Sequence, residues 1–255
     1  DCNESVELAR LIFDFGKRAA EEDGVSGWSK LAIIAHHDCL GDLITLSPLL
    51  FNQHIPVFYI RELGVIDDAT AASIQGGDFT DLIALGVDKH IPDTFLAACA
   101  THGVKSERLI GKNPYDANEK INDLITSGQV EGARLTIDNL IVSSVWNPAD
   151  AFAAGAWAAK TDSAFLLEDP QNLDSVAHAI SYIKKKGGSV KHLTFLGDSS
   201  QFGRLDKEML GKAVQEALVD AGLADTGAED AQPAETERTD FTSTDAASAN
   251  TQENE

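Results

Sequence analysis

A histidine-histidine-aspartate run follows the first strongly apolar segment of the chain. His36, His37 and Asp38 stand directly after residues 31–35, and Asp42 comes four positions later. Imidazole nitrogens and carboxylate oxygens are common ligands of divalent metals, and a bound metal can activate water for attack on a phosphoester. The run therefore indicates one candidate chemistry, a metal-dependent phosphoesterase that uses His36, His37, Asp38 and Asp42.

Other features of the sequence weigh against that chemistry. The run looks like the first motif of the phosphoesterases named for an Asp-His-His triplet, but the chain contains no such triplet. None of the remaining histidines has a companion carboxylate at ligand-like spacing. The nucleophile elbow Gly-x-Ser-x-Gly, the Gly-rich phosphate loop and the His-Glu-x-x-His motif are also missing from the sequence. We therefore expect no enzyme activity, no bound metal and no cofactor.

Composition narrows the classes of partner. The chain has 255 residues and a net charge of -21, of which the segment 223–255 contributes nine carboxylates and one arginine. The preceding 222 residues thus carry -13, and so acidic a body is a poor ligand for nucleic acid, whose phosphates are neutralised by Lys and Arg. No apolar run approaches the roughly 20 residues of a membrane-spanning helix. Cys2, Cys39 and Cys99 are too few and too scattered for a disulfide framework.

The elements that must position any site repeat along the chain. Residues 33–60 align with 141–168 at a constant offset of 108, which places Asp42 on Asp150. With small insertions, 82–86 aligns with 193–197 as a short apolar strand that ends in glycine. Further pairs are Ile66-Asp67 with Leu173-Asp174 and Ile91 with Phe202.

Each copy reads strand, polar loop, helix, strand, and short apolar runs alternating with helical stretches are typical of βαβ units. We therefore predict an α/β fold of two tandem Rossmann-like or toprim-like repeats with mainly parallel sheets. The expected divisions are a first repeat at 1–104, which is incomplete at its N-terminus, a second at 105–222, and a disordered acidic tail at 223–255.

The second copy resembles the cell-wall-binding repeats found in tandem on bacterial surface proteins and autolysins. Arg108, Gly111 and Tyr115 match the opening Arg-x-x-Gly-x-x-Arg-Tyr element, although Pro114 stands where the family has Arg. The segments 150–155, 164–167 and 195–197 match the Asp-Ala-Leu-Ala-Ala helix, the Pro-Ile-Leu-Leu element and the final strand that runs into glycine. The first copy matches at Asp42 and lacks the opening element.

This resemblance implies a secreted, non-catalytic protein of the cell wall or cell surface. Its expected partners are a secondary polymer or glycan of the wall and neighbouring surface proteins, with oligomers possible. The chain begins at Asp1 rather than Met, which is compatible with a removed signal peptide. A third reading is an α/β scaffold of the same fold that has lost polymer binding.

The resemblance also implies a set of site residues. The residues expected to bind polymer are Arg108, Gly111, Tyr115, Asp150, Leu166, Leu167 and Asp42. The two aspartates stand where a loop enters a helix, so they could instead cap its free N–H groups or face its positive end. Wall polymers of this kind are often anionic and would repel an acidic body. Binding would then need a local basic pocket around Arg108, Lys112 and Arg134, or bridging cations.

Overall fold

The computed structural model describes residues 2–22, 30–130, 135–197 and 200–224. Most of the tail expected to be disordered, from residue 225 onward, lies outside these residues, and so does Arg134. The elements are α1 (Cys2–Glu22), β1 (Leu31–His36), a 3-10 turn (His37–Cys39), α2 (Leu40–Gln53), β2 (Val57–Ile60), α3 (Asp68–Gln75), β3 (Asp81–Leu85), α4 (Asp93–Thr101), β4 (Lys105–Leu109), α5 (Pro114–Thr126), β5 (Thr136–Ser144), α6 (Pro148–Lys160), β6 (Ser163–Glu168), α7 (Leu173–Lys185), β7 (His192–Leu196) and α8 (Arg204–Asp220). None of the described helices is both long enough and apolar enough to cross a membrane.

The first sheet has four parallel strands in the order β2-β1-β3-β4. Every residue of β1 is buried, because helices cover both faces of the sheet. Side chains of α1, α3 and α4 pack on one face, and side chains of α2 and α5 pack on the other. Strands buried on both faces explain the nearly continuous apolar runs of the sequence.

The second sheet has three parallel strands in the order β6-β5-β7. Helices α7 and α8 cover one face, and α6 covers the other together with Ile44 from α2. The predicted α/β class with parallel sheets is therefore confirmed.

Strand pairing reproduces the offset seen in the sequence. Ile33 pairs with Val57 in the first sheet, and Ile141 pairs with Phe165 in the second, each 108 residues later. One expected pairing is displaced, because α3 is capped by Asp67 whereas α7 is capped by Asn172, two residues earlier than the alignment with Leu173-Asp174 requires. The strand β4, which follows the expected division at 104, pairs with β3 of the first sheet. Within the described residues β7 has no such neighbour.

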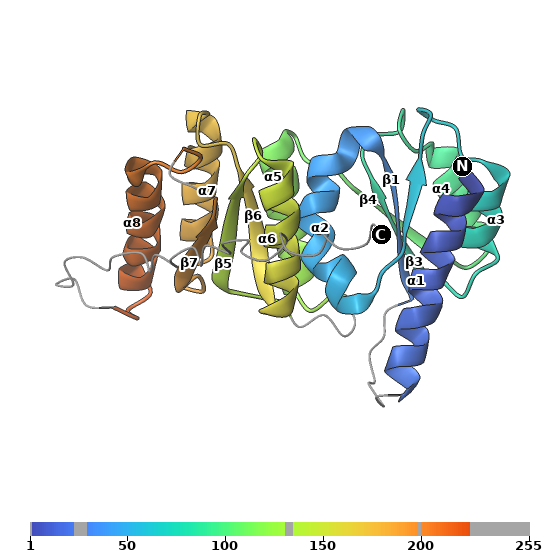
Figure 1. The fold of residues 1–255 in the computed structure, drawn as a ribbon, viewed down its shortest axis with the longest axis horizontal. Helices are drawn as coiled ribbons and strands as arrows, with labels where there is room; N and C mark the ends of the chain where they lie inside the picture. The colour runs from blue at the N-terminus through green and yellow to red at the C-terminus, as the bar shows by residue number, and fades with distance from the viewer. Residues whose placement is uncertain (1, 23–29, 131–134, 198–199, 225–255) are drawn as a thin grey trace, which may run out of the picture.

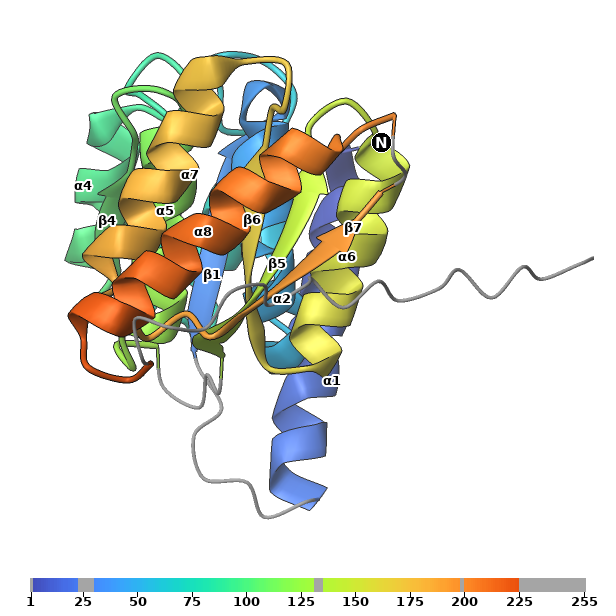
Figure 2. The same cartoon turned by 90° about the vertical axis from the view of Figure 1, so that its left-hand side faces the viewer.

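The two units form five layers along the long axis, with helices α2, α5 and α6 between the sheets (Figure 1). Turning the molecule brings α7 and α8 to the front, over the outer face of the second sheet (Figure 2). Gly155 of α6 meets α2 so closely that an added Cβ would lie 1.8 Å from Ser47 Oγ. The small side chains of α6 therefore allow it to approach a helix of the first unit as well as its own sheet.

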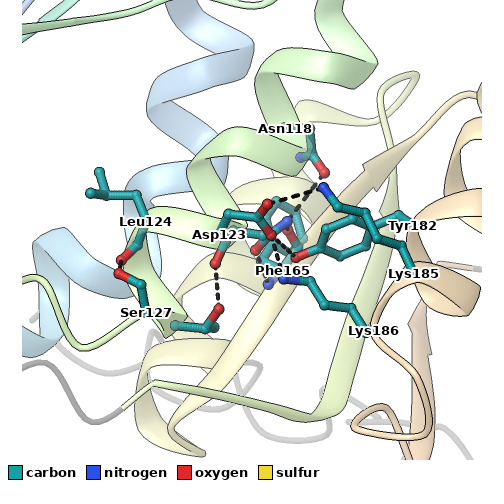
Figure 3. Close-up of polar contacts among 10 residues, drawn as sticks. Asn118, Asp123, Leu124, Ser127, Phe165, Tyr182, Lys185 and Lys186 are labelled. Atoms are coloured by element: carbon teal, nitrogen blue, oxygen red, sulfur yellow. Dashed lines mark hydrogen bonds and ion pairs between the residues drawn. The ribbon is translucent and has the colours of Figure 1, made fainter.

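Helix α5 fastens the two units by polar contacts. The side-chain amide of Asn122 donates to the Phe165 carbonyl oxygen at 2.7 Å and accepts from the Phe165 N–H at 3.1 Å, so it pairs the free edge of β6. One turn along, the Asp123 carboxylate receives Tyr182, Lys185 and Lys186 of α7 (Figure 3). These contacts leave the edge strand without orphaned backbone groups at this point.

Candidate functional site

The connections of each sheet reverse direction at one point. In the first sheet the chain leaves β1 toward β2 on one side and returns to β3 on the other, and in the second sheet β5, β6 and β7 do the same. In open parallel sheets, ligands bind in the crevice at the carboxyl ends of the strands at such a point. The sites to compare are therefore the ends of β1 and β3, and the ends of β5 and β7.

The end of β1 carries the histidine-aspartate run. His36 is buried, whereas His37 and Asp38 are exposed, and one ligand atom from each lies within 4.8 Å of the others. His37 Nε2 lies 3.1 Å from Asp38 Oδ1, and His36 Nδ1 lies 3.5 Å from Asp38 Oδ2. His36 Nε2 lies 3.1 Å from the Arg61 carbonyl oxygen, which can only accept, so this nitrogen carries the hydrogen.

The structure adds His90, which sequence spacing did not connect with the run. His90 comes from the loop after β3, and its Nε2 lies 3.4 Å from Asp38 Oδ2. Gly86 makes this approach possible: its φ is +99°, and a Cβ there would fall 2.5 Å from His90 Nδ1. The glycine after an apolar strand was visible in the sequence, but its contact with a distant histidine was not. Asp42, the fourth ligand expected from the sequence, is not part of the cluster.

The corresponding place in the second sheet has different chemistry. At the offsets of 108 and 111 residues, His36, His37, Asp38 and His90 correspond to Ser144, Val145, Trp146 and Gln201. The backbone N–H of Trp146 donates to Ser144 Oγ at 3.2 Å, just as the Asp38 N–H donates to His36 Nδ1 at 3.2 Å. The turn is therefore shared by the two units, whereas the group of nitrogen and carboxylate atoms belongs to the first unit.

Three residues of the expected polymer site meet at the junction of the units. Tyr115 at the start of α5, with Leu166 and Leu167 at the end of β6, lines a small hollow. The Tyr115 hydroxyl accepts from Asn172 Nδ2 at 2.7 Å, and its ring lies 5.6 Å from the ring of His178. The hollow thus combines an aromatic surface with hydroxyl and imidazole groups.

A buried carboxylate forms part of the same hollow. Glu168 is 1% exposed, and neither of its side-chain oxygens has a hydrogen-bond partner. Burial, followed by repulsion from Asp206 and Asp169, raises the pKa of Glu168 to about 7. A carboxyl group in this setting favours its protonated form near neutral pH.

The remaining expected residues lie apart from the hollow. Arg108 on β4 donates to the carbonyl oxygens of Gly86 and Ile91 at 2.7 Å each and pairs with Asp93. An added Cβ at Gly111 would lie 2.2 Å from the Ala117 nitrogen, so this glycine allows the start of α5 to fold back. Both positions have structural work within the first unit.

The expected capping role of the two aspartates is wrong. The N-cap of α6 is Asn147, which accepts from the N–H groups of Ala149 and Asp150, and the N-cap of α2 is Cys39. Asp42 and Asp150 instead lie in the first turn, where a carboxylate faces the positive end of the helix. Burial raises the pKa of Asp42 to about 6, and Asp150 accepts from Gln201 Nε2 at 2.9 Å.

Comparison with known proteins supports the fold. No protein-family model matches the chain, and no curated protein sequence does. Among solved structures, Cwp8 from Clostridium difficile matches 77% of the chain with a TM-score of 0.54 and 14% identity. Cwp6 from the same organism matches 72% with a TM-score of 0.58 and 15% identity. The chain spans 30% and 28% of these proteins, and at this identity the likeness is one of fold.

Proposed function

We propose that this chain is a non-catalytic module of a cell-surface protein and attaches without a covalent bond to a polymer of the cell wall. The observation that carries the proposal is the fold likeness to two cell wall proteins, Cwp8 and Cwp6, across more than two thirds of the chain. The residue pattern of cell-wall-binding repeats, present in the second copy, supports the same assignment.

The hollow at the junction of the units is the proposed contact with the polymer. Tyr115 and His178 offer an aromatic surface and hydrogen-bonding groups, which suit the apolar faces and hydroxyls of a sugar ring. The acidic side chains beside them, Glu119 and Glu168, disfavour a phosphate or carboxylate at the same place. The contact therefore suits an uncharged sugar of the wall polymer.

Arg108 has a different part in this proposal. Its guanidinium group already donates to two carbonyl oxygens and pairs with Asp93. Its replacement should lower the stability of the first unit together with binding, because buried carbonyl groups would lose their donors.

Pelleting with isolated cell walls tests the proposal. The purified chain should sediment with Clostridium difficile walls that retain their secondary polymers and should stay in solution after those polymers are stripped. Tyr115→Ala should reduce the retained fraction several-fold, because it removes the aromatic surface of the hollow. Tyr59→Ala, which alters a tyrosine 39% exposed on the edge strand β2, is the matched control.

Melting temperatures of both variants separate a loss of contact from a loss of fold. Equal retention by stripped and intact walls would exclude polymer binding. Retention by Tyr115→Ala equal to that of the unmodified chain, at unchanged stability, would move the contact away from this hollow.

Ionic strength identifies the chemistry of the contact. Because the body is acidic and the proposed contact is uncharged, retention should stay constant or rise as added salt screens repulsion from an anionic polymer. A steep fall in retention with salt would indicate basic side chains as the contact instead.

A further inference from the structure

The histidine cluster at the end of the first sheet is not satisfied by its own hydrogen bonds. His90 is 9% exposed, and its Nε2 makes no hydrogen bond. His90 Nδ1 lies 4.0 Å from Cys39 Sγ, and this thiol donates to the Leu85 carbonyl oxygen. A sulfur whose hydrogen is already used accepts from Nδ1–H, so Nε2 is the ring nitrogen with the lone pair.

Lone pairs therefore face one another around a single carboxylate. His90 Nε2 lies 3.4 Å from Asp38 Oδ2, and His36 Nδ1, the acceptor nitrogen of its ring, lies 3.5 Å from the same oxygen. Two acceptors at this separation repel unless a cation lies between them. Arg61, whose carbonyl oxygen accepts from His36 Nε2, holds that ring in the required orientation.

The separations match the edges of a metal coordination polyhedron. A tetrahedral zinc site with ligands about 2.0–2.1 Å from the ion has ligand-to-ligand edges of about 3.3–3.4 Å. The three nitrogen-to-oxygen separations around Asp38 are 3.1, 3.4 and 3.5 Å. His36 and His90 form a buried floor, and the exposed His37 and Asp38 leave a path from solvent.

We propose that His36, His37, Asp38 and His90 form a binding site for a borderline divalent cation such as Zn²⁺, placed where β1 and β3 diverge. Three imidazoles and one carboxylate favour zinc over magnesium or calcium, which prefer oxygen ligands. On binding, His36 Nδ1 exchanges its hydrogen bond from the Asp38 N–H for the metal. The site is independent of polymer attachment at the junction of the units.

The second unit serves as an internal comparison. Its turn keeps the backbone hydrogen bond at 3.2 Å, with Ser144 in place of His36, so an imidazole is not needed to form the turn. The other corresponding positions hold Val145, Trp146 and Gln201, and all four ligand positions thus differ together. The imidazoles of the first unit are therefore surplus to the requirements of the fold.

Zinc titration of the whole chain tests the site. After dialysis against a chelator, calorimetric titration with Zn²⁺ should saturate at one ion per chain, and Mg²⁺ should give no comparable binding. Co²⁺ used as a probe should give the intense visible absorption of tetrahedral coordination. His37→Ala and His90→Gln should each lower zinc affinity at least about tenfold.

The control is His192→Gln, which alters an exposed histidine of β7 outside the cluster and should bind zinc as the unmodified chain does. His37 is exposed, so its variant should fold normally and decides the question alone if His90→Gln fails to fold. Failure to bind zinc, or zinc affinity unchanged in His37→Ala, would overturn the proposal.

Discussion

Two carboxylates on neighbouring elements show how surroundings set the behaviour of a residue. Burial alone would raise the pKa of Asp123, but the hydrogen bonds and charges of Lys186 and Lys185 outweigh it and lower that pKa. Glu168 is buried without such a partner, and its pKa is raised to about 7. Of the two, Glu168 is therefore the residue at which the fold holds an unfavourable charge above neutral pH.

The stability of the protein should depend on pH through Glu168. Its native pKa of about 7 exceeds the ordinary value of 4.5, so its stabilising contribution is complete below pH 4.5 and is lost as the pH rises through 7. The loss is of the order of 3 kcal/mol. Between pH 5 and 8 the melting temperature of Glu168→Gln should fall less than that of the unmodified chain, and the variant should be the more stable at pH 8.

Thermal unfolding followed by circular dichroism at several pH values checks this expectation. Glu208→Gln, which alters an exposed glutamate of α8, should leave the pH profile unchanged. Parallel profiles for Glu168→Gln and the unmodified chain would show that Glu168 has an ordinary pKa.

Among the helices, α6 is distinguished by its small side chains. Ala151, Ala154 and Ala158 are buried together with Phe165 and with Ile44 of α2, and Gly155 meets Ser47 of that helix. Helix α8 carries Gly211, whose added Cβ would meet nothing within 4 Å. The two helical glycines thus have different reasons to be present.

Replacing each glycine by alanine should change stability in opposite directions. Gly211→Ala should raise the free energy of unfolding by about 0.5–1 kcal/mol, because alanine favours a helix. Gly155→Ala should lower it by about 1–3 kcal/mol, because the new methyl group overlaps Ser47 between two packed helices. Urea denaturation measures both, and adding Ser47→Ala should recover part of the loss. A stabilising Gly155→Ala would mean that α2 and α6 are less closely packed than described.

At the scale of the whole molecule, the two sheets share a layer of helices. Side chains of α2 complete the cores of both units, with Leu46 and Leu49 facing the first sheet and Ile44 facing the second. Asn122 of α5 pairs the edge of β6 through the backbone of Phe165. The units are therefore expected to unfold together.

Asn122→Ala tests this coupling. It would leave the buried N–H and C=O of Phe165 without partners, at an expected cost of about 2–4 kcal/mol. Asn52→Ala, which removes a partly buried bond to Asp162 that also joins the units, should cost about 1 kcal/mol or less. Urea denaturation should show one transition in every case. A separate early transition in Asn122→Ala would show that the second unit unfolds by itself.

Local patterns in the sequence were sufficient for the class of fold. Apolar runs of strand length and the offset of 108 residues predicted the parallel pairing of β1 with β2 and of β5 with β6. Gly86 and Gly197 likewise marked the ends of two strands, and both have a positive φ. Burial on both faces of a strand depends on near neighbours, so it leaves a periodic signature that can be read along the chain.

The sites depended on contacts between distant segments. His90 reaches Asp38 only because β3 lies beside β1, and Arg108 reaches Gly86 only because β4 joins the first sheet. Sequence spacing contains no record of strand order, so it assigned no partner to His90 and left Arg108 free for a ligand. The polymer contacts of Tyr115, Leu166 and Leu167 stay predictions. The order of strands in the sheets and the shared helices between them decide which polar groups meet, because these long-range contacts determine which groups are removed from water together.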